Sequence, residues 1–208
     1  MKKFIWFLII LVIQLHQTTV FAQSSASSSH HKWLFNFETN FYLAYPSTIV
    51  PIFTVDKGNF HFEKRFSYES PKTGSIWFGY NFKGGNELNY IVTPMAGVLL
   101  GRIDGIAGGL EITFNYFEFQ LYSEMEYVFD FKSSSNNFFY NWTDLTYSPL
   151  DWFFAGLSTQ RTKVYQTNSD FQWGPFTGVE YKGLGLTFYF YNPGSDDFYL
   201  ILTLDYSF

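Results

Sequence analysis

Apolar and polar residues alternate with a period of two along almost the whole chain after residue 32. Between residues 59 and 69, for example, Phe60, Phe62 and Phe66 alternate with polar residues. This alternation is typical of β-strands whose two faces lie in different environments. The pattern predicts an all-β protein whose clear strand segments are residues 33–44, 59–69, 74–82, 87–100, 106–116, 117–131, 138–147, 150–161, 170–181, 184–191 and 199–208.

The number of strands depends on two ambiguous places. Between Leu110 and Phe131 the apolar face shifts by one residue near residues 115–118, and such a slip moves every side chain to the opposite face. We expect a tight turn there, since an unbroken strand would far exceed the roughly 9–11 residues of a membrane strand. The Pro-interrupted residues 46–57 supply a further strand. Twelve strands are favoured, and ten result if the slip is a bulge or residues 59–69 form a loop.

Two local sequence signals add to the alternating pattern: a turn within it and an export signal before it. Before residues 150–161 the sequence "SPLD", residues 148–151, predicts a short turn. At the other end of the chain, Lys2 and Lys3 precede the apolar stretch 4–15, and small residues stand near Ala22. This arrangement is typical of a cleaved signal peptide, and the apolar stretch is too short for the roughly 20 residues of a membrane-spanning helix.

The domain organisation follows from these signals. We expect a signal peptide over residues 1–22, a flexible periplasmic leader over the Ser-rich residues 23–32, and a single β-barrel over residues 33–208.

Composition favours a barrel in a membrane over a soluble one. Aromatic residues make up 24% of the chain, and 27 residues are Phe, more than a water-soluble core of this size requires. Turned outward, the apolar faces form a lipid-facing band with aromatic girdles, while the polar faces line a lumen. A closed barrel also satisfies every backbone polar group in lipid. The alternative is a secreted soluble β-protein.

The final strand supplies a family resemblance. Leu204, Tyr206 and Phe208 alternate with polar residues up to the last position. Together with the signal peptide and the alternating segments, this ending resembles that of bacterial outer-membrane β-barrel proteins. The resemblance implies an outer-membrane location, contact with membrane lipids, and recognition of the terminal strand by the barrel-assembly machinery. Twelve strands in a chain this short resemble the small substrate-specific channels, such as nucleoside and oligogalacturonate channels.

Candidate chemistry is concentrated on the polar face. Cysteine is absent, which excludes disulfides and thiolate metal sites, and the net charge of −5 offers no basic surface for nucleic acid. No cofactor is implied. Acidic residues on adjacent segments predict either a cation-preferring or sugar-binding lumen, or a packed ion-pair interior that plugs the barrel. The candidate lumen-lining residues are Arg65, Glu111, Glu118, Gln120, Glu124, Glu126, Asp130 and Arg161.

The sequence predicts a protein without catalytic activity, either a small channel for ions or small polar solutes or a plugged structural barrel. Neither a G-x-S-x-G nor an H-E-x-x-H motif occurs. The alternative is a lipid-modifying enzyme with His61 as its general base, since Ser67 and Glu63 share its polar face.

Overall fold

The computed structural model describes residues 32–44, 46–164 and 170–208. The expected signal peptide, residues 1–22, and residues 23–31 of the expected leader lie outside the described residues. No helix in the described part of the chain is long and apolar enough to cross a membrane. The elements are β1 (Trp33–Leu43), β2 (Thr48–Lys57), β3 (Phe60–Phe66), β4 (Thr73–Tyr80), β5 (Phe82–Gly85), β6 (Leu88–Gly101), β7 (Gly105–Tyr116), β8 (Phe119–Asp130), η1 (Ser134–Asn136), β9 (Phe138–Leu150), β10 (Phe153–Val164), β11 (Asp170–Tyr181), β12 (Leu184–Tyr191) and β13 (Tyr199–Ser207).

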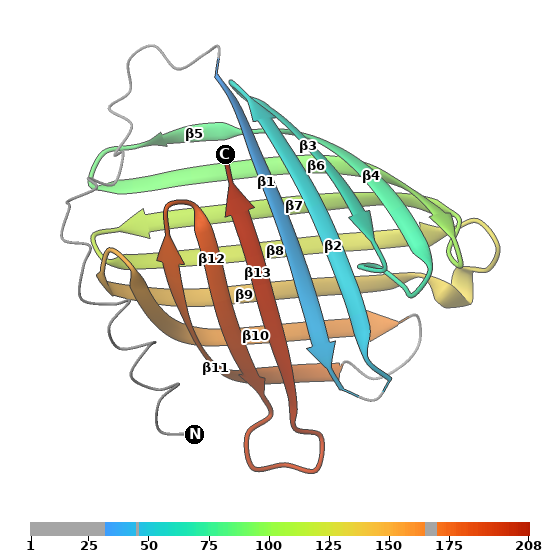
Figure 1. Cartoon of the computed structure of the whole chain (residues 1–208). Coiled ribbons are helices and arrows are strands. Elements are labelled where there is room, and N and C mark those ends of the chain that lie inside the picture. Colours follow the sequence, from blue (N-terminus) through green and yellow to red (C-terminus); the bar gives the residue numbers. More distant parts are fainter. Residues whose placement is uncertain (1–31, 45, 165–169) are drawn as a thin grey trace.

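The strands form one closed antiparallel barrel (Figure 1). Pairing of β1 with β13 joins the first and last strands. β4 and β5 share one position because both pair with β6 in a single continuous register, with Gly79 opposite Met95 and Phe82 opposite Val92. The barrel therefore has twelve strand positions, which confirms the favoured count.

The ambiguous segments resolve in favour of strands joined by tight turns. Residues 46–57 contain β2, and the parity slip falls at the two-residue turn 117–118 between β7 and β8. The expected turn at 148–151 is wrong, because β9 continues to Leu150 and the turn is formed by residues 151–152. A register shift opposite Phe154 accommodates Pro149, whose missing N–H is tolerated at a bulge.

The two ends of the barrel differ in their connections. At the end that holds Lys32 and Phe208, the connections 58–59, 86–87, 117–118, 151–152 and 182–183 have two residues each. Longer connections lie at the opposite end: residues 67–72, 131–137 and 192–198. Transmembrane barrels of bacteria have this asymmetry, with short turns on the periplasmic side and longer loops outside the cell.

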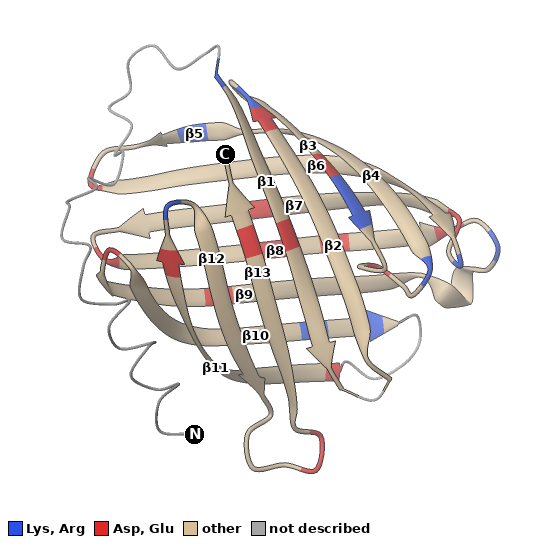
Figure 2. Ribbon diagram, in the orientation of Figure 1, with Lys and Arg blue, Asp and Glu red and all other residues tan. Residues whose placement is uncertain are grey.

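The outer surface of the wall is apolar. Phe60, Phe78 and Leu100 are 70%, 65% and 68% exposed, whereas Trp77 and Leu99, which point inward, are fully buried. Figure 2 shows long uncharged stretches of wall, with acidic positions along β1, β8 and β13. An apolar exterior around a polar interior is the arrangement of a membrane barrel. It does not fit the alternative of a soluble β-protein, which would turn these aromatic faces inward.

Candidate functional site

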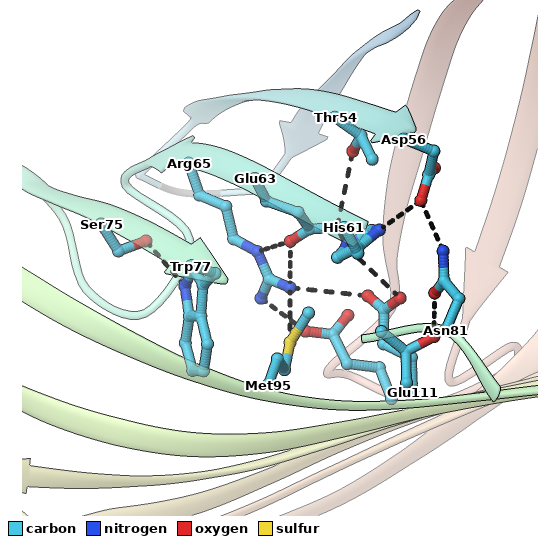
Figure 3. Close-up of polar contacts among 12 residues, drawn as sticks. Thr54, Asp56, His61, Glu63, Arg65, Ser75, Trp77, Asn81, Met95 and Glu111 are labelled. Atoms are coloured by element: carbon cyan, nitrogen blue, oxygen red, sulfur yellow. Dashed lines mark hydrogen bonds and ion pairs between the residues drawn. The ribbon is translucent and has the colours of Figure 1, made fainter. Parts of the chain in front are cut away.

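Arg65 occupies the centre of the barrel interior. The alternation of β3 turns His61, Glu63 and Arg65 inward, and Arg65 is only 2% exposed. Its Nη1 atom lies 2.5 Å from a Glu124 oxygen and 3.4 Å from a Glu126 oxygen, and Nη2 lies 3.6 Å from Glu111. The carboxylates around this guanidinium belong to Glu63, Glu111, Glu124 and Glu126 (Figure 3 shows Glu63 and Glu111). Three strands, β3, β7 and β8, therefore converge on one cation.

Acidic side chains outnumber basic side chains in this interior. The buried charged side chains among the described residues are Glu63, Glu124, Glu126, Asp130, Asp144, Arg65 and His61. One oxygen of Glu126, Oε1, is buried without a hydrogen-bond partner in the described structure. Burying a carboxylate is costly unless it is paired and hydrogen-bonded. The cluster is therefore suited to accept a further positive charge.

Aromatic side chains cover the guanidinium. The Arg65 Cζ atom lies 4.6 Å from the ring centroid of Tyr68 and 5.0 Å from that of Trp77. Tyr68 also donates a 2.7 Å hydrogen bond to Glu124. An added Cβ at Gly97 would lie 2.5 Å from the Trp77 ring, so glycine at this position leaves room for the indole. The stacking and hydrogen bonds hold the Arg65 side chain in one orientation.

His61 belongs to a second network on the side of the tight turns. Its Nδ1 atom lies 3.0 Å from an Asp56 oxygen. Asn81 donates a 2.6 Å hydrogen bond to the same oxygen (Figure 3) and accepts one of 2.6 Å from Thr93. Ser67, which the sequence placed on the same face, lies in the loop after β3 and accepts a hydrogen bond from the Lys72 backbone. The charged neighbours of His61 are carboxylates from β2, β3 and β7.

A third polar cluster, centred on Asp144, lies across the interior on β9, β10 and β12. Asp144 accepts hydrogen bonds from Trp142 at 2.7 Å, from Tyr189 at 3.0 Å and from Ser158. Sequence reasoning missed this cluster because residues 138–147 alternate weakly and aromatic residues occupy both faces of β9. On the inward face of β9 the aromatic residues Tyr140 and Trp142 precede Asp144 at every second position, so alternation gave no clear signal for this carboxylate.

A cavity of about 320 Å³ connects the long-loop end to the central cluster. Its lining includes Arg102 and Asn136 near the mouth and Glu126 at depth. Tyr68 and Tyr140, whose rings meet edge to face with centroids 5.7 Å apart, form part of the wall. This volume is large enough for several water molecules. Water therefore has a path from the loops to the buried carboxylates.

Comparison with solved structures establishes the type of barrel. One neighbour is a KdgM porin, with a TM-score of 0.62, 12% identity, and coverage of 84% of this chain and 99% of that chain. Another is a KdgM porin in complex with disordered oligogalacturonate, with a TM-score of 0.62, 11% identity and the same coverage. The fold is that of a small porin. No protein-family model matches the chain, and no curated protein matches its sequence.

The porin-like barrel brings together only some of the residues that the sequence predicted to line the lumen. Arg65, Glu111, Glu124 and Glu126 meet in the interior. Glu118 instead lies in the exposed 117–118 turn. Gln120, which is also exposed, lies next to this turn and donates a 2.8 Å hydrogen bond to Asn115. A strand rises about 3.3 Å per residue, so β8 distributes its side chains along the full height of the barrel.

Asp130 lies at the other end of β8, beside the long loops. It accepts hydrogen bonds of 2.6 Å from Asn136 and 2.9 Å from the Lys132 backbone. The Lys132 ammonium lies 2.7 Å from Asp104, which belongs to the β6–β7 connection. The hydrogen bond between them holds the pKa of Asp104 below its usual range. Asp130 therefore helps to order the loop rather than joining the central cluster.

Arg161 lies on the outer face of the porin-like barrel. It follows Gln160, which is buried and points inward, so the alternation of β10 directs Arg161 outward, where it is exposed. The expectation that Arg161 lines the lumen is not met, because the sequence pattern of residues 150–161 leaves the inward face ambiguous. The closed barrel decides it through pairing of β10 with β9 and β11.

Proposed function

We propose that the protein is a non-enzymatic outer-membrane channel for small cations or small uncharged polar solutes. The observation that carries this proposal is the charged interior at the height of the apolar outer band, where four glutamates surround Arg65. A cavity from the long-loop end reaches Glu126. Polar groups inside a lipid-facing wall are characteristic of solute pathways.

The Arg65 cluster forms the constriction of this channel. Because Arg65, Glu124 and Glu126 are almost fully buried, their side chains fill the lumen at this height. Passage of a solute therefore requires the guanidinium to exchange partners among the surrounding carboxylates. This requirement favours small solutes and a low conductance.

The charge of the interior favours cations and disfavours anions. One solved neighbour contains oligogalacturonate, a carboxylated sugar chain. In the present chain the buried carboxylates outnumber the single buried guanidinium among the described residues, so a carboxylated sugar is repelled at the constriction. The proposal therefore separates the solute of this barrel from that of the neighbour.

Location and assembly belong to the same proposal. Residues 1–22 act as the export signal, and the apolar outer surface contacts outer-membrane lipids. On β13 and directly after it, Leu204, Tyr206 and Phe208 are 40%, 46% and 58% exposed. These residues offer the barrel-assembly machinery an aromatic edge beside the β1–β13 seam.

The geometry does not favour the lipid-modifying enzyme. His61 is buried inside the barrel and 6% exposed, whereas a lipid substrate contacts the outer wall. Its neighbours Asp56, Glu63 and Glu111 are all carboxylates and offer no nucleophile of the serine type.

Planar-bilayer recording tests the channel. The folded wild-type protein is expected to give small single-channel steps with a reversal potential that indicates cation preference in a salt gradient. Glu124→Gln is expected to lower the cation preference at least about twofold, because it removes the carboxylate that pairs with Arg65 at the constriction. Glu118→Gln makes the same chemical change in the exposed turn and is the matched control, with unchanged selectivity.

Two results contradict the proposal. The first is a silent bilayer with protein whose folding is shown by its altered gel mobility without heating. The second is an equal change of selectivity in both variants, which would place the selective charges outside the interior.

A further inference from the structure

Three donor atoms from three different residues face one another beside the Arg65 cluster. The His61 Nε2 atom lies 3.2 Å from Glu63 Oε1 and 3.9 Å from Glu111 Oε2. These residues come from β3 and β7, and all three ligand atoms lie within 4.8 Å of one another. An ion with tetrahedral geometry and bonds of about 2.0–2.1 Å holds its donors about 3.4 Å apart. The two distances from Nε2 lie on either side of this value.

The imidazole is oriented for coordination through Nε2. Its Nδ1 atom faces Asp56 at 3.0 Å, so in the neutral ring the N–H on that side donates to the carboxylate and the lone pair stays on Nε2. Asn81 and Thr93 fix Asp56 in turn. A carboxylate that accepts from the distal nitrogen is the usual second partner of a metal-binding histidine.

A separate observation shows that Nε2 lacks a partner. His61 is 6% exposed, and its buried Nε2 makes no hydrogen bond within the described structure. The Glu63 oxygen at 3.2 Å does not lie along the direction that a hydrogen bond from the ring requires. A buried polar atom is rarely left unpaired. An ion placed between the imidazole and the carboxylates satisfies it.

The two glutamates divide their oxygens between the two sites. Glu63 directs Oε2 to Arg65 and Oε1 to His61, and Glu111 directs Oε1 to Arg65 and Oε2 to His61. Glu124 and Glu126 also contact Arg65 and compensate its charge. One oxygen of each glutamate therefore faces the histidine, and that of Glu63 also accepts a long hydrogen bond of 3.5 Å from Thr54.

We infer that His61, Glu63 and Glu111 form a binding site for one divalent transition-metal cation of the Zn²⁺ class, with Asp56 orienting the histidine. One imidazole and two carboxylates suit such a cation better than Ca²⁺ or Mg²⁺, which prefer oxygen ligands alone. Glu111 is the most exposed of the three ligands, with 14% of its side chain accessible to solvent. The site does not depend on conduction by the channel.

Zinc binding to the full chain folded in detergent tests the inference. The background carries His16→Gln, His30→Gln and His31→Gln, so that the histidines of residues 1–31 do not contribute. One Zn²⁺ per folded chain is expected by equilibrium dialysis after treatment with a chelator. His61→Gln is expected to abolish this binding, and Asp56→Asn to weaken it about 10- to 100-fold. Glu111→Gln is expected to weaken it as well, with Glu118→Gln as the matched control that leaves it unchanged.

X-ray absorption of the zinc-loaded protein with His61 intact provides a readout that needs no change in the site. It is expected to show one imidazole nitrogen and oxygen ligands at about 2.0–2.1 Å. An all-oxygen ligand shell overturns the inference. So do the absence of Zn²⁺ on folded protein, equal binding with His61→Gln, and binding of Ca²⁺ or Mg²⁺ as tight as that of Zn²⁺.

Discussion

Arg65 shows how a single side chain can organise the interior of a barrel. Its guanidinium contacts four glutamates on β3, β7 and β8 and two aromatic rings, one on β4 and one in the connection that precedes it. Alternation in β3 indicates from sequence that Arg65 and Glu63 share a face. The meeting with Glu124 does not follow from alternation, because it depends on which strands lie opposite one another across the lumen.

The central cluster predicts a large effect of removing its cation. Arg65→Met leaves the surrounding carboxylates without their shared partner, and breaking a buried ion pair in this way costs about 3–5 kcal/mol. We expect the free energy of unfolding in urea, measured on the barrel folded in lipid vesicles, to fall by this amount. Arg102→Met, at an exposed position in the β6–β7 connection, is the control and is expected to change it far less. Similar losses for both variants would show that Arg65 carries no special role in stability.

At the scale of elements, the sequence predicts strands well and their ends less well. Strong alternation in residues 59–69 and 170–181 produced segments close to β3 and β11. The turn near residue 150 was misplaced because Pro149 reads as a turn residue, while the structure accommodates it in a bulge of β9. A bulge depends on the partner strand, which local sequence does not contain.

The turn between β11 and β12 allows a test of one such element. Gly183 has a φ of +80° and follows Lys182 at +52°, as in a two-residue hairpin turn with both central residues left-handed. A Cβ at Gly183 would also lie 2.5 Å from the Ser207 carbonyl oxygen. Gly183→Ala is therefore expected to lower the free energy of unfolding by more than about 1 kcal/mol.

Gly108→Ala is the matched control for this turn. A Cβ there meets no atom within 4 Å, so little change is expected in the same urea titration. If Gly183→Ala proved as stable as Gly108→Ala, the turn conformation would be contradicted.

At the scale of the whole molecule, the unequal ends of the barrel define its orientation in the membrane. The sequence contains no cysteine, so a single introduced cysteine can report whether one end of the barrel is accessible from outside the cell. Asp196→Cys lies in the long 192–198 connection, and Asp151→Cys lies in a two-residue turn. Both positions are exposed.

Intact cells treated with a membrane-impermeant maleimide are expected to label Asp196→Cys and leave Asp151→Cys unlabelled. The physical reason is that long loops face the exterior and short turns face the periplasm. Labelling of both positions after the membrane is permeabilised is the control for reactivity. The reverse pattern on intact cells would invert the orientation.

The sequence by itself determined the strands, the inward and outward faces of most of them, and the favoured count of twelve. These properties follow from local alternation, because adjacent side chains of a strand must point to opposite sides. Only the tertiary structure decided that Glu118 and Arg161 stay outside the interior cluster, while Asp56 and Asp144 belong to two other polar networks inside the barrel. The height of a residue along the barrel and its neighbours across the lumen depend on strand register and closure, which couple residues far apart in the chain.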